Sequence, residues 1–469
     1  MTALETTVQY LYLGAAACFV LGLHLMNTPA TARRGNLISA GAMAVAAAGT
    51  VVLLLARGTT SGAAWLVIGL AAGLGSAVGV VAARNVQITA MPQLVSLFNA
   101  VGGGAAALLA AGHLTGEPPG TLDARVTVPG ALDIAIGTVA FAGSLIAAGK
   151  LQGWVPGRPV GLPGVRLVSV LSGLVAVAAA GWLVAAPGLP GMLLLIVAAL
   201  GFAVAMGLPI GGADAPVVIS LLNAATGIAV ALAGFVLDVP VLIIGGGLVG
   251  ASGSILTKLM ADAMNRSIPA ILLGGFGVDA GQAAEAATGA LVRTVTVDDV
   301  AVQLAYADRV VIVPGYGLAA AQAQHELAAL ANQLVRHGVQ VGYAIHPVAG
   351  RMPGHMDVLL AEANVPYQQL LDLESANQAL PRADVALVVG ANDVTNPAAR
   401  RPGNPVSGMP ILDVDRAQQI VVIKRSLSPG YAGIDNELYH NPRTGMLFAD
   451  AKQALTDLLT AVRAYAPAA

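Results

Sequence analysis

Hydrophobic and polar positions divide the chain into two parts with different periodicity. Up to about residue 260, the sequence consists of nearly continuous apolar segments of about 20 residues, long enough for a helix to cross a hydrocarbon core about 30 Å thick. From about residue 296 onward, short β-branched runs alternate with helical patterns of ordinary polarity. The two patterns predict a polytopic α-helical membrane domain followed by an α/β domain with a Rossmann-like, doubly wound parallel sheet.

Nine apolar segments are predicted to be transmembrane helices. They cover approximately residues 4–26, 36–56, 63–83, 92–112, 130–149, 166–186, 190–209, 214–236 and 239–261. An odd number of spans places the two termini on opposite sides of the membrane. If the C-terminal domain is cytoplasmic, the inner loops carry eight Lys and Arg residues and the outer loops only Arg57 and Arg125, in agreement with the positive-inside rule. We therefore predict a multi-pass protein of the bacterial inner membrane with a cytoplasmic C-terminal domain.

The change in polarity sets the predicted domain boundaries. A transmembrane domain is expected at residues 1–262, a linker at 263–295 and the C-terminal domain at 296–469. The chain is 56% hydrophobic and 10% charged with a net charge of −2, which excludes an ordinary soluble protein and gives no sign of nucleic-acid binding. Its single cysteine, Cys18, excludes an intrachain disulfide and a cysteine metal cluster, and we predict no metal site.

Two predicted membrane helices share a repeated pattern, which indicates a parallel internal repeat of the kind found in transporters. The two copies read Pro92-x-x-x-Ser96-Leu97-x-Asn99-Ala100-x-x-Gly103 and Pro216-x-x-x-Ser220-Leu221-x-Asn223-Ala224-x-x-Gly227. In each copy the serine and the asparagine are three residues apart and share one helix face. Because polar groups in hydrocarbon need partners, two interpretations are open: hydrogen bonds that hold helices together, and a pathway for protons or ions.

Titratable groups near this pattern are few. Asp214, at the start of the eighth predicted helix, is a candidate gate residue of the pathway; alternatively, the helix dipole favours a carboxylate at that position. The membrane histidines His24 and His113 lie at helix ends and are predicted to be interfacial. Since asparagines cannot carry a proton as an acid or base, a proton path needs a titratable neighbour, which another chain can supply.

A strand, a tight turn and a helix are predicted around residues 309–322. The β-branched run Val310–Val313 leads into Gly315-x-Gly317-x-x-Ala320, and an Ala-rich helical pattern follows. In a dinucleotide site the first glycine allows the turn, the second lets a pyrophosphate approach the backbone, and a small third residue lets the helix pack on the strand. The helix N-terminus then faces the anion. An ordinary strand-to-helix turn is the alternative interpretation.

The rest of the C-terminal domain continues this alternation. Strands are predicted at 309–314, 339–345, 384–389 and 420–423, and helices at 318–336, 355–363 and 450–463. A site that prefers NAD would place an acid at the end of the second strand, but residues 344–347 read Ala-Ile-His-Pro, which favours NADP. Cations for the additional phosphate are available in Lys424-Arg425-Ser426 and in Arg351. A solvated strand end is the alternative interpretation of the Lys-Arg pair.

Two further loops carry residues that suit a nucleotide site. Gly390-Ala391-Asn392-Asp393 ends a strand and offers an amide and a carboxylate to a nicotinamide; alternatively, Asn and Asp only build a turn there. Gly430-Tyr431-Ala432-Gly433 is flexible and aromatic, as a lid over a nucleotide would be; alternatively, it is a surface loop.

The sequence motifs, taken together, resemble those of the β subunit of the proton-translocating NAD(P) transhydrogenase, and the resemblance spans the chain. The matching motifs are Val313-Pro-Gly-Tyr-Gly317, His346-Pro-Val-Ala-Gly-Arg351-Met-Pro-Gly-His355, Gly390-Ala-Asn-Asp393, Lys424-Arg-Ser426, Gly430-Tyr-Ala-Gly433 and Asn265-Arg-Ser267. The resemblance implies a proton-translocating membrane domain at 1–262 and an NADP(H)-binding domain at 296–469. It also implies that NAD(H) is bound by a separate α subunit.

The resemblance further implies roles for individual residues. Gly315 and Gly317 would border the pyrophosphate, and Lys424 and Arg425 the 2′-phosphate. The predicted cofactor-binding residues are Gly315, Tyr316, Gly317, Leu318, Ala319, Val348, Ala349, Gly350, Arg351, Gly390, Ala391, Asn392, Asp393, Lys424, Arg425, Ser426, Gly430, Tyr431 (in the lid) and Ala432. The residues predicted to take part in the reaction are Asp393 at the nicotinamide, Asn223 at the position of the family's channel asparagine, and Asn99 and Asp214 on the proton path.

Two positions depart from the family pattern. Asn99 stands where some members have a membrane histidine, so the titratable group is expected from elsewhere, such as a helix of the partner subunit. Val394-Thr395 reverses the usual order, which puts the side-chain contacts of Thr395 in question.

The reaction implied by the resemblance is hydride transfer between NAD(H) on the partner and NADP(H) on this chain, coupled to inward proton movement, with no side chain as chemical catalyst. The expected partners are the α subunit, a small membrane subunit and the lipid bilayer, in a dimer of heteromers. Two other functions remain open from the sequence: a membrane transporter with an NADP(H)-sensing domain, and a membrane-bound reductase with a quinone or haem partner. The predicted spans contain no histidine pair suited to haem, which weighs against the reductase.

Overall fold

The structure is a computed structural model of the 469-residue chain. It describes residues 3–26, 28–58, 60–87, 90–117, 122–156, 160, 164–210, 214–264, 267–272, 292–350, 354–404, 406–430 and 432–465. The chain folds as two compact units, one formed by Met1–Pro209 with Ile219–Leu256 and the other by Ile210–Val218 with Thr257–Ala469. Most of the predicted linker, residues 273–291, lies outside the described residues.

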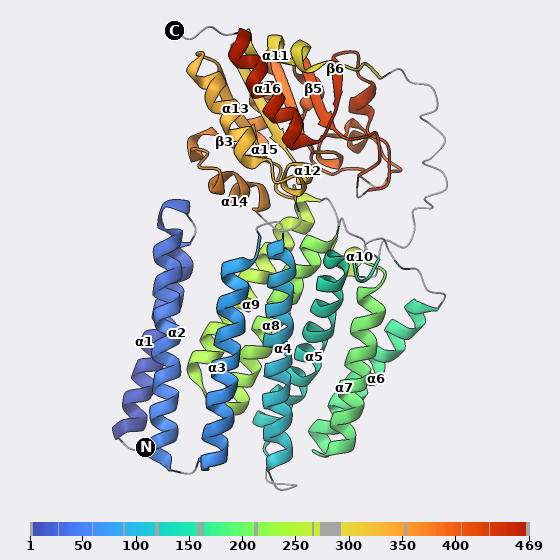
Figure 1. Ribbon diagram of the computed structural model, residues 1–469. Helices are drawn as coiled ribbons and strands as arrows, with labels where there is room; N and C mark the ends of the chain where they lie inside the picture. Colours follow the sequence, from blue (N-terminus) through green and yellow to red (C-terminus); the bar gives the residue numbers. More distant parts are fainter. Residues whose placement is uncertain are drawn as a thin grey trace. The chain divides into compact units, whose positions relative to one another are not determined.

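The predicted membrane helices come first in the chain (Figure 1). Among the described residues, nine helices are long and apolar enough to span a membrane: α1 (Ala3–Leu25), α2 (Pro29–Arg57), α3 (Gly62–Asn85), α4 (Met91–Gly116), α5 (Ala124–Gln152), α6 (Val165–Ala185), α7 (Leu189–Gly207), α8 (Ala215–Leu237) and α9 (Pro240–Ala263). The predicted polytopic membrane domain is confirmed. Helices α2 and α5 begin several residues before the predicted spans, because hydropathy marks only the part of a helix at hydrocarbon depth.

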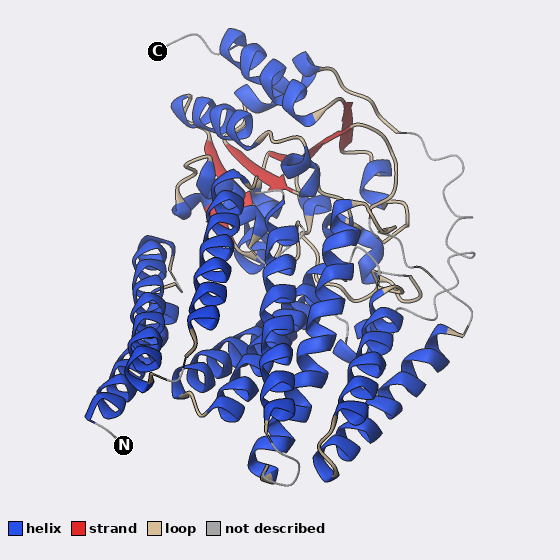
Figure 2. Cartoon of the chain, turned by 60° about the horizontal axis from the view of Figure 1, so that its bottom comes forward, coloured by secondary structure: helices blue, strands red, loops and turns tan. Residues whose placement is uncertain are grey.

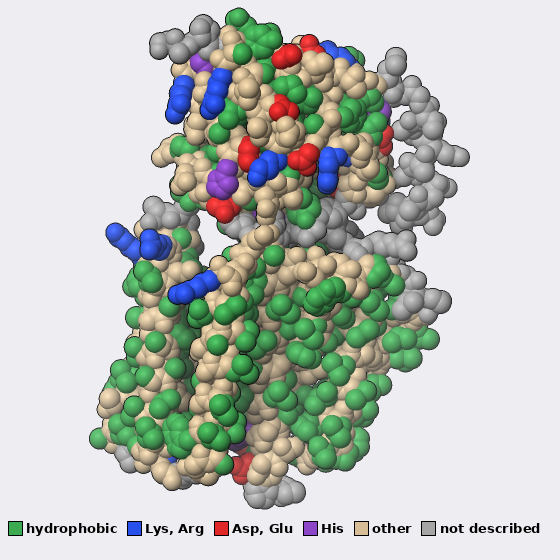
Figure 3. All heavy atoms as spheres, viewed as in Figure 1, with side chains coloured by type: hydrophobic (Ala, Val, Ile, Leu, Met, Phe, Trp, Pro, Cys, Tyr) green, Lys and Arg blue, Asp and Glu red, His purple; other side chains and the backbone are tan. Residues whose placement is uncertain are grey.

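Small residues let these helices approach one another closely. A Cβ atom on Gly137 of α5 would lie 2.5 Å from the carbonyl oxygen of Gly103 on α4, and one on Gly227 of α8 would lie 2.4 Å from the backbone nitrogen of Gly250 on α9. Close backbone packing of this kind drives helix association in lipid, where burial of apolar surface gives no advantage. Hydrophobic side chains cover the face of the helices seen in Figure 3, as expected for a surface in contact with lipid.

The C-terminal domain contains a six-stranded parallel sheet with the order β3-β2-β1-β4-β5-β6. The strands are drawn in red in Figure 2, with helices around them. The strands are β1 (Arg309–Pro314), β2 (Gln340–Ala344), β3 (Leu370–Leu371), β4 (Val385–Val389), β5 (Gln419–Lys424) and β6 (Thr444–Phe448). This order confirms the predicted doubly wound α/β fold. Strands β3 and β6 were not predicted, because β3 has only two residues and β6 contains a glycine and no run of β-branched residues.

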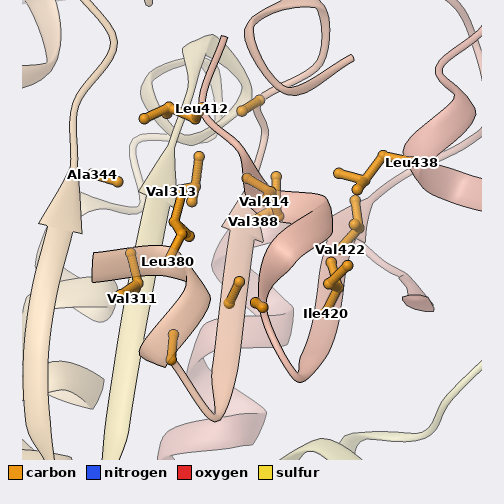
Figure 4. Close-up of a cluster of buried hydrophobic side chains, with 14 of the residues drawn as sticks. Val311, Val313, Ala344, Leu380, Val388, Leu412, Val414, Ile420, Val422 and Leu438 are labelled. Carbon is orange, nitrogen blue, oxygen red and sulfur yellow. The ribbon is translucent and has the colours of Figure 1, made fainter. Parts of the chain in front are cut away.

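Helices and short helical turns cover both faces of the sheet. Helices α11 (Val297–Ala305), α13 (Gln324–Arg336) and α16 (Ala451–Tyr465) pack together, and α16 contacts β5. A cluster of buried hydrophobic side chains joins Val311, Val388 and Val422 of the strands to Leu380 and Leu412 (Figure 4). Burial on both faces explains why the strands are continuous β-branched runs without polar alternation.

The single helix predicted at 318–336 is wrong. The chain forms α12 (Tyr316–Ala320), turns, and starts α13 at Gln324. At the turn, Gln322 has a φ of 51°, in the left-handed region, which ends α12. Alanine favours a helix throughout this stretch, so its sequence does not reveal the break. The helices predicted at 355–363 and 450–463 correspond to α14 (His355–Glu362) and α16.

Candidate functional site

The carboxyl ends of β1 and β4 form the topological switch point of the sheet. After β1 the chain continues to β2 on one side, and after β4 it continues to β5 on the opposite side. The loops that follow β1 and β4 therefore diverge and leave a crevice between them. A cleft lies at this point. Its lining includes Gly315, Tyr316, Gly317, Val348, Ala349, Gly350, Gly390, Ala391, Asn392, Asp393, Lys424, Arg425, Ser426 and Gly430 from the sequence-predicted set. Residues from five separate motifs therefore share one edge of the sheet.

Three of the remaining predicted cofactor residues do not line the cleft, and two lie outside the described residues. Leu318 and Ala319 are fully buried under the turn, and neither lines the cleft. Ala432 is also absent from the lining, although its backbone bonds to a lining residue. Arg351 and Tyr431 lie outside the described residues.

The glycine turn packs directly on the loop that follows β4. A Cβ atom on Gly315 would lie 2.3 Å from Cα of Ala391, and one on Gly317 would lie 2.6 Å from Cα of Gly390. The backbone N–H of Gly317 donates to the carbonyl oxygen of Gly390 at 2.9 Å. Gly390 has a φ of 69°, which favours glycine. These glycines are thus needed for contact between two backbone segments, a role that the spacing of the motif alone does not reveal.

A neutral histidine supports the loop after β2. His346 is buried, its Nε2 lies 2.7 Å from the carbonyl oxygen of Pro410, and the backbone N–H of Val348 donates to its Nδ1 at 3.3 Å. Since a carbonyl can only accept, we assign the proton to Nε2. Burial lowers the pKa of His346 to about 4, although the bond to Pro410 opposes the shift. The imidazole therefore holds the Val348–Gly350 loop in place as an uncharged group.

Asp393 connects the loop after β4 to the predicted lid. Its Oδ2 accepts a hydrogen bond from the backbone N–H of Ala432 at 3.0 Å. A Cβ atom on Gly430 would lie 2.4 Å from Oδ1 of Asp393, so only glycine allows this approach. The Asp393 carboxylate consequently fixes the backbone of Gly430 and Ala432 at the edge of the cleft.

A buried polar network, which the sequence analysis missed, fixes Asn392. The side-chain amide of Asn436 donates to the backbone oxygen of Asn392 at 3.0 Å, and the hydroxyl of Tyr439 donates to Asn392 Oδ1 at 2.9 Å. Thr395 belongs to the same network, since its hydroxyl donates to the Asn392 carbonyl at 2.8 Å. The reversed Val394-Thr395 order is therefore compatible with a well-bonded Thr395. No spacing signal links Asn436 and Tyr439 to Asn392, because they are more than 40 residues away.

The two adjacent cations at the end of β5 have different environments. Nζ of Lys424 lies 5.3 Å from the ring centre of Tyr439 and donates to the carbonyl oxygen of Ser428. Burial lowers the pKa of Lys424, against the opposing effect of the carboxylates of Asp393 and Asp435. Arg425 is exposed and forms no ion pair with the residues that the structure describes. Arg425 is thus available to an anion, whereas Lys424 already interacts with the protein.

A second group of polar residues lies among the membrane helices. A Cβ atom on Gly103 would lie 2.8 Å from Cβ of Ala140, so one turn further along the antiparallel α4–α5 pair Asn99 and Ser144 reach the same level. Asn99 Nδ2 and Ser144 Oγ are buried and have no hydrogen-bond partner within the described part of the chain. The Thr226 hydroxyl of α8 donates to the carbonyl oxygen of Asn99 at 3.1 Å. The sequence analysis missed Ser144, because a serine in an apolar segment carries no distinguishing signal.

The repeated serines differ from the asparagines in their bonding. The hydroxyl of Ser96 donates to the Pro92 carbonyl within α4 at 2.9 Å, and that of Ser220 lies 3.4 Å from the Gly253 carbonyl oxygen of α9. These serines fit the interpretation of hydrogen bonds within and between helices. Asn223 is partly buried on α8, and Asp214 is buried just before the same helix begins.

The chain is similar to known proteins along nearly its whole length. Residues 8–461 match the family model of the NAD(P) transhydrogenase beta subunit. The NAD(P) transhydrogenase subunit beta of Rhodospirillum rubrum is 44% identical over 460 residues, which cover 96% of this chain and 98% of the relative, and a strain of that species gives the same values. A solved structure of a thiamin diphosphate-dependent enzyme from Mycobacterium smegmatis aligns with 39% of this chain and 32% of its own at 19% identity, with a TM-score of 0.23 that is too low to bear on the fold. The chain belongs to the NAD(P) transhydrogenase beta subunit family.

Proposed function

We propose that this chain binds NADP(H) in the cleft at the ends of β1 and β4. The family activity is that of an oxidoreductase acting on nicotinamide nucleotides, in association with other subunits. The proposal for this cleft rests on one observation: the glycine turn of Gly315–Gly317 and the cations of Lys424 and Arg425 line the same cleft. The absence of an acid after β2 adds to it, since an acid there would hold the ribose 2′-hydroxyl of NAD.

The residues of the cleft have separate roles in this proposal. Arg425 offers a planar fork of donors to the 2′-phosphate, and the half-buried Lys424 adds a second positive charge beside it. Asn392 and Asp393 lie at the nicotinamide end. The buried network around Asn392 keeps that side chain in one orientation, and Asp393 holds the backbone N–H of Ala432. Arg351 and Tyr431, which lie outside the described residues, are proposed to add a cation and a lid side chain.

The nicotinamide supplies the hydride chemistry when it is bound, so the residues of this chain need only position it and control access of water. We propose that NAD(H) is held by an α subunit, with a small membrane subunit in the same complex and two copies of the complex forming a dimer. The C-terminal domain would face the cytoplasm from the inner membrane, as the distribution of Lys and Arg favours.

Hydride transfer is proposed to be coupled to inward proton movement past Asn99 and Asn223, with Asp214 as a gate. The support is the pair of buried groups at the level of Asn99 that have no hydrogen-bond partner among the described residues. A polar group without a partner is costly at this depth, and water in a pathway would supply the partner. The family match does not favour the alternative of a transporter that only senses NADP(H).

Calorimetric titration of the purified chain with NADP⁺ and NAD⁺ tests the assignment of the cleft. We expect much tighter binding of NADP⁺. Equal affinity for the two nucleotides would remove the 2′-phosphate assignment.

A further inference from the structure

A fully buried carboxylic acid lies in the middle of helix α5. Asp133 has 0% of its surface exposed, and neither carboxylate oxygen has a hydrogen-bond partner within the described part of the chain. The sequence analysis did not single it out, because one acid barely alters the hydropathy of a 29-residue helix. Ionisable residues inside a membrane segment are rare and are usually paired, which makes an unpaired one a candidate for function.

The surroundings of Asp133 are apolar and small. Asp133 shares one face of α5 with Gly137, Ala140 and Ser144, at intervals of four, three and four residues, and this face packs on α4. At the neighbouring level, Ala106 of α4 packs against Ala229 and Ala233 of α8, with Ile136 of α5 beside them. Apart from Ser144, which is 11 residues away along α5, none of these groups can donate a side-chain hydrogen bond, and none can neutralise a carboxylate.

Few charged or titratable side chains lie on α5 and on the helices around it, α4, α6, α7 and α8. The sequences of α7 and α8 contain none, α6 has only Arg166 in its first turn, and α5 itself has Arg125 and Lys150 near its ends. On α4 the only such group is His113. The only titratable side chain that these helices bring near the depth of Asp133 is therefore His113.

His113 of α4 lies near the depth of Asp133 in the membrane. Asn99, Ala106 and His113 recur every seven residues and so share one face of the helix. A Cβ atom on Gly130 would lie 2.9 Å from a side-chain carbon of Leu114, so His113 is at the level of the first turns of α5, close to where Asp133 lies along that helix. His113 is partly exposed, as a group between a buried acid and the membrane surface would be.

We propose that Asp133 is the titratable group of this chain's proton path, loaded from the side of the membrane that contains the α4–α5 connection. The proposal rests on the proposed function, because it assumes that protons cross this unit. In the loaded state a proton is bound to one carboxylate oxygen, which removes the unpaired negative charge from the apolar site. On release that O–H bond breaks, and the proton passes to water or to a ring nitrogen of His113, leaving the carboxylate. Asparagine and serine cannot take part in such a cycle as acids or bases, so Asp133 provides what Asn99, Ser144 and Asn223 lack.

The close α4–α5 contact separates Asp133 from those three residues. Asp133 precedes Ser144 by 11 residues, or about 16 Å along the helix axis, which is too far for one proton transfer. The Gly103–Gly137 contact lies between the two levels and leaves no room for water. Passage of a proton from Asp133 to the Asn99 level therefore requires α4 and α5 to separate, so this contact is the place where access would alternate between the two sides.

The test compares Asp133→Asn with Asp133→Glu in vesicles that contain this chain with its NAD(H)-binding partner. Asparagine keeps the size of the side chain but cannot titrate, whereas glutamate keeps the acid. We expect Asp133→Asn to lower the rate of proton pumping about 100-fold and Asp133→Glu to retain most of it. Thr138→Val, on another side of α5, is the matched control and should pump at the wild-type rate. Nucleotide binding should be unchanged in all three variants.

The outcomes separate this inference from the proposed function. Failure of the wild-type complex to pump protons would overturn both. Normal pumping by wild type and by Asp133→Asn would overturn only the inference, and would mean that Asp133 is a structural acid that stays protonated. If Asp133→Asn does not assemble, infrared spectra of the wild type and Asp133→Glu decide: a carboxylic-acid carbonyl band that differs between them and titrates during turnover supports the inference, and a band that never titrates refutes it.

Discussion

Replacing Arg425 with alanine should weaken the binding of NADP(H) and leave that of NAD(H) unchanged. The structure leaves the Arg425 guanidinium exposed and without an ion pair among the described residues, so no interaction within the protein competes with a phosphate. A charge-assisted hydrogen bond contributes about 1.5–3 kcal/mol. Because the side chain is in solvent, we expect the lower end of that range, about 1.5 kcal/mol, which corresponds to roughly a tenfold increase in Kd.

Lys424 is less suited to this experiment. Its ammonium group also contacts the Ser428 carbonyl and the Tyr439 ring, so Lys424→Ala would disturb the loop after β5 as well as remove a charge. Its effect on NADP(H) therefore cannot be assigned to the phosphate alone. Arg425→Lys is the more informative partner, because it keeps the charge but loses the fork geometry and should give an intermediate Kd.

Isothermal titration of the purified chain with NADP⁺ and NAD⁺ measures the effect. Arg336→Ala removes another exposed arginine, on α13, and serves as the matched control with no change in either Kd. The difference between wild type and Arg425→Ala should shrink as salt is added, since the contact is electrostatic. An equal loss for both nucleotides, or no loss at all, would refute the assignment of Arg425 to the 2′-phosphate.

Two further predictions concern His346 and the membrane asparagines. The pKa of His346 is about 4 in the folded chain and about 6.5 in the unfolded chain. Between these pH values only the unfolded chain binds the additional proton. The contribution of His346 to the free energy of unfolding is therefore complete above pH 6.5 and falls by on the order of 3 kcal/mol as the pH drops to 4. Urea unfolding of a fragment of residues 292–465, followed by circular dichroism, measures this; a His346→Gln variant with the same pH slope in that window would contradict it. Asn99→Leu and Asn223→Leu should block or uncouple proton pumping in vesicles without changing NADP(H) affinity, with the larger effect at Asn223. Wild-type pumping by both variants would make these asparagines packing groups.

Much of the architecture could be predicted because it depends on local sequence. A membrane span needs about 20 apolar residues in succession, so nine spans could be counted without knowing how the helices pack. Strands buried on both faces are β-branched runs, and four of the six were predicted. The α12–α13 break was missed because alanine favours helix on both sides of Gln322, and only packing in the fold decides where the helix stops.

The cleft illustrates which parts of a site a motif can and cannot predict. The motifs identified Gly315, Gly317 and Gly390 from their spacing, and the structure places all three in the cleft lining. Their contacts with one another follow from the pairing of β1 with β4, which brings together segments more than 70 residues apart. Asn436 and Tyr439 hold Asn392 in place, and nothing in their own sequence indicates that task.

The sequence by itself determined the two-part organisation, the membrane spans, the parallel sheet and the family of this protein, because each of these follows from hydropathy, periodicity or motifs that are read within one segment. The tertiary structure decided which polar groups are satisfied. Ser96 and Ser220 find carbonyl acceptors, whereas Asn99, Ser144 and Asp133 each keep a buried polar atom that has no partner in the part of the chain that the structure describes, although all five lie in similarly apolar helices. The difference cannot be found within a segment, since a hydrogen bond depends on the position of a partner atom, and helix packing sets that position.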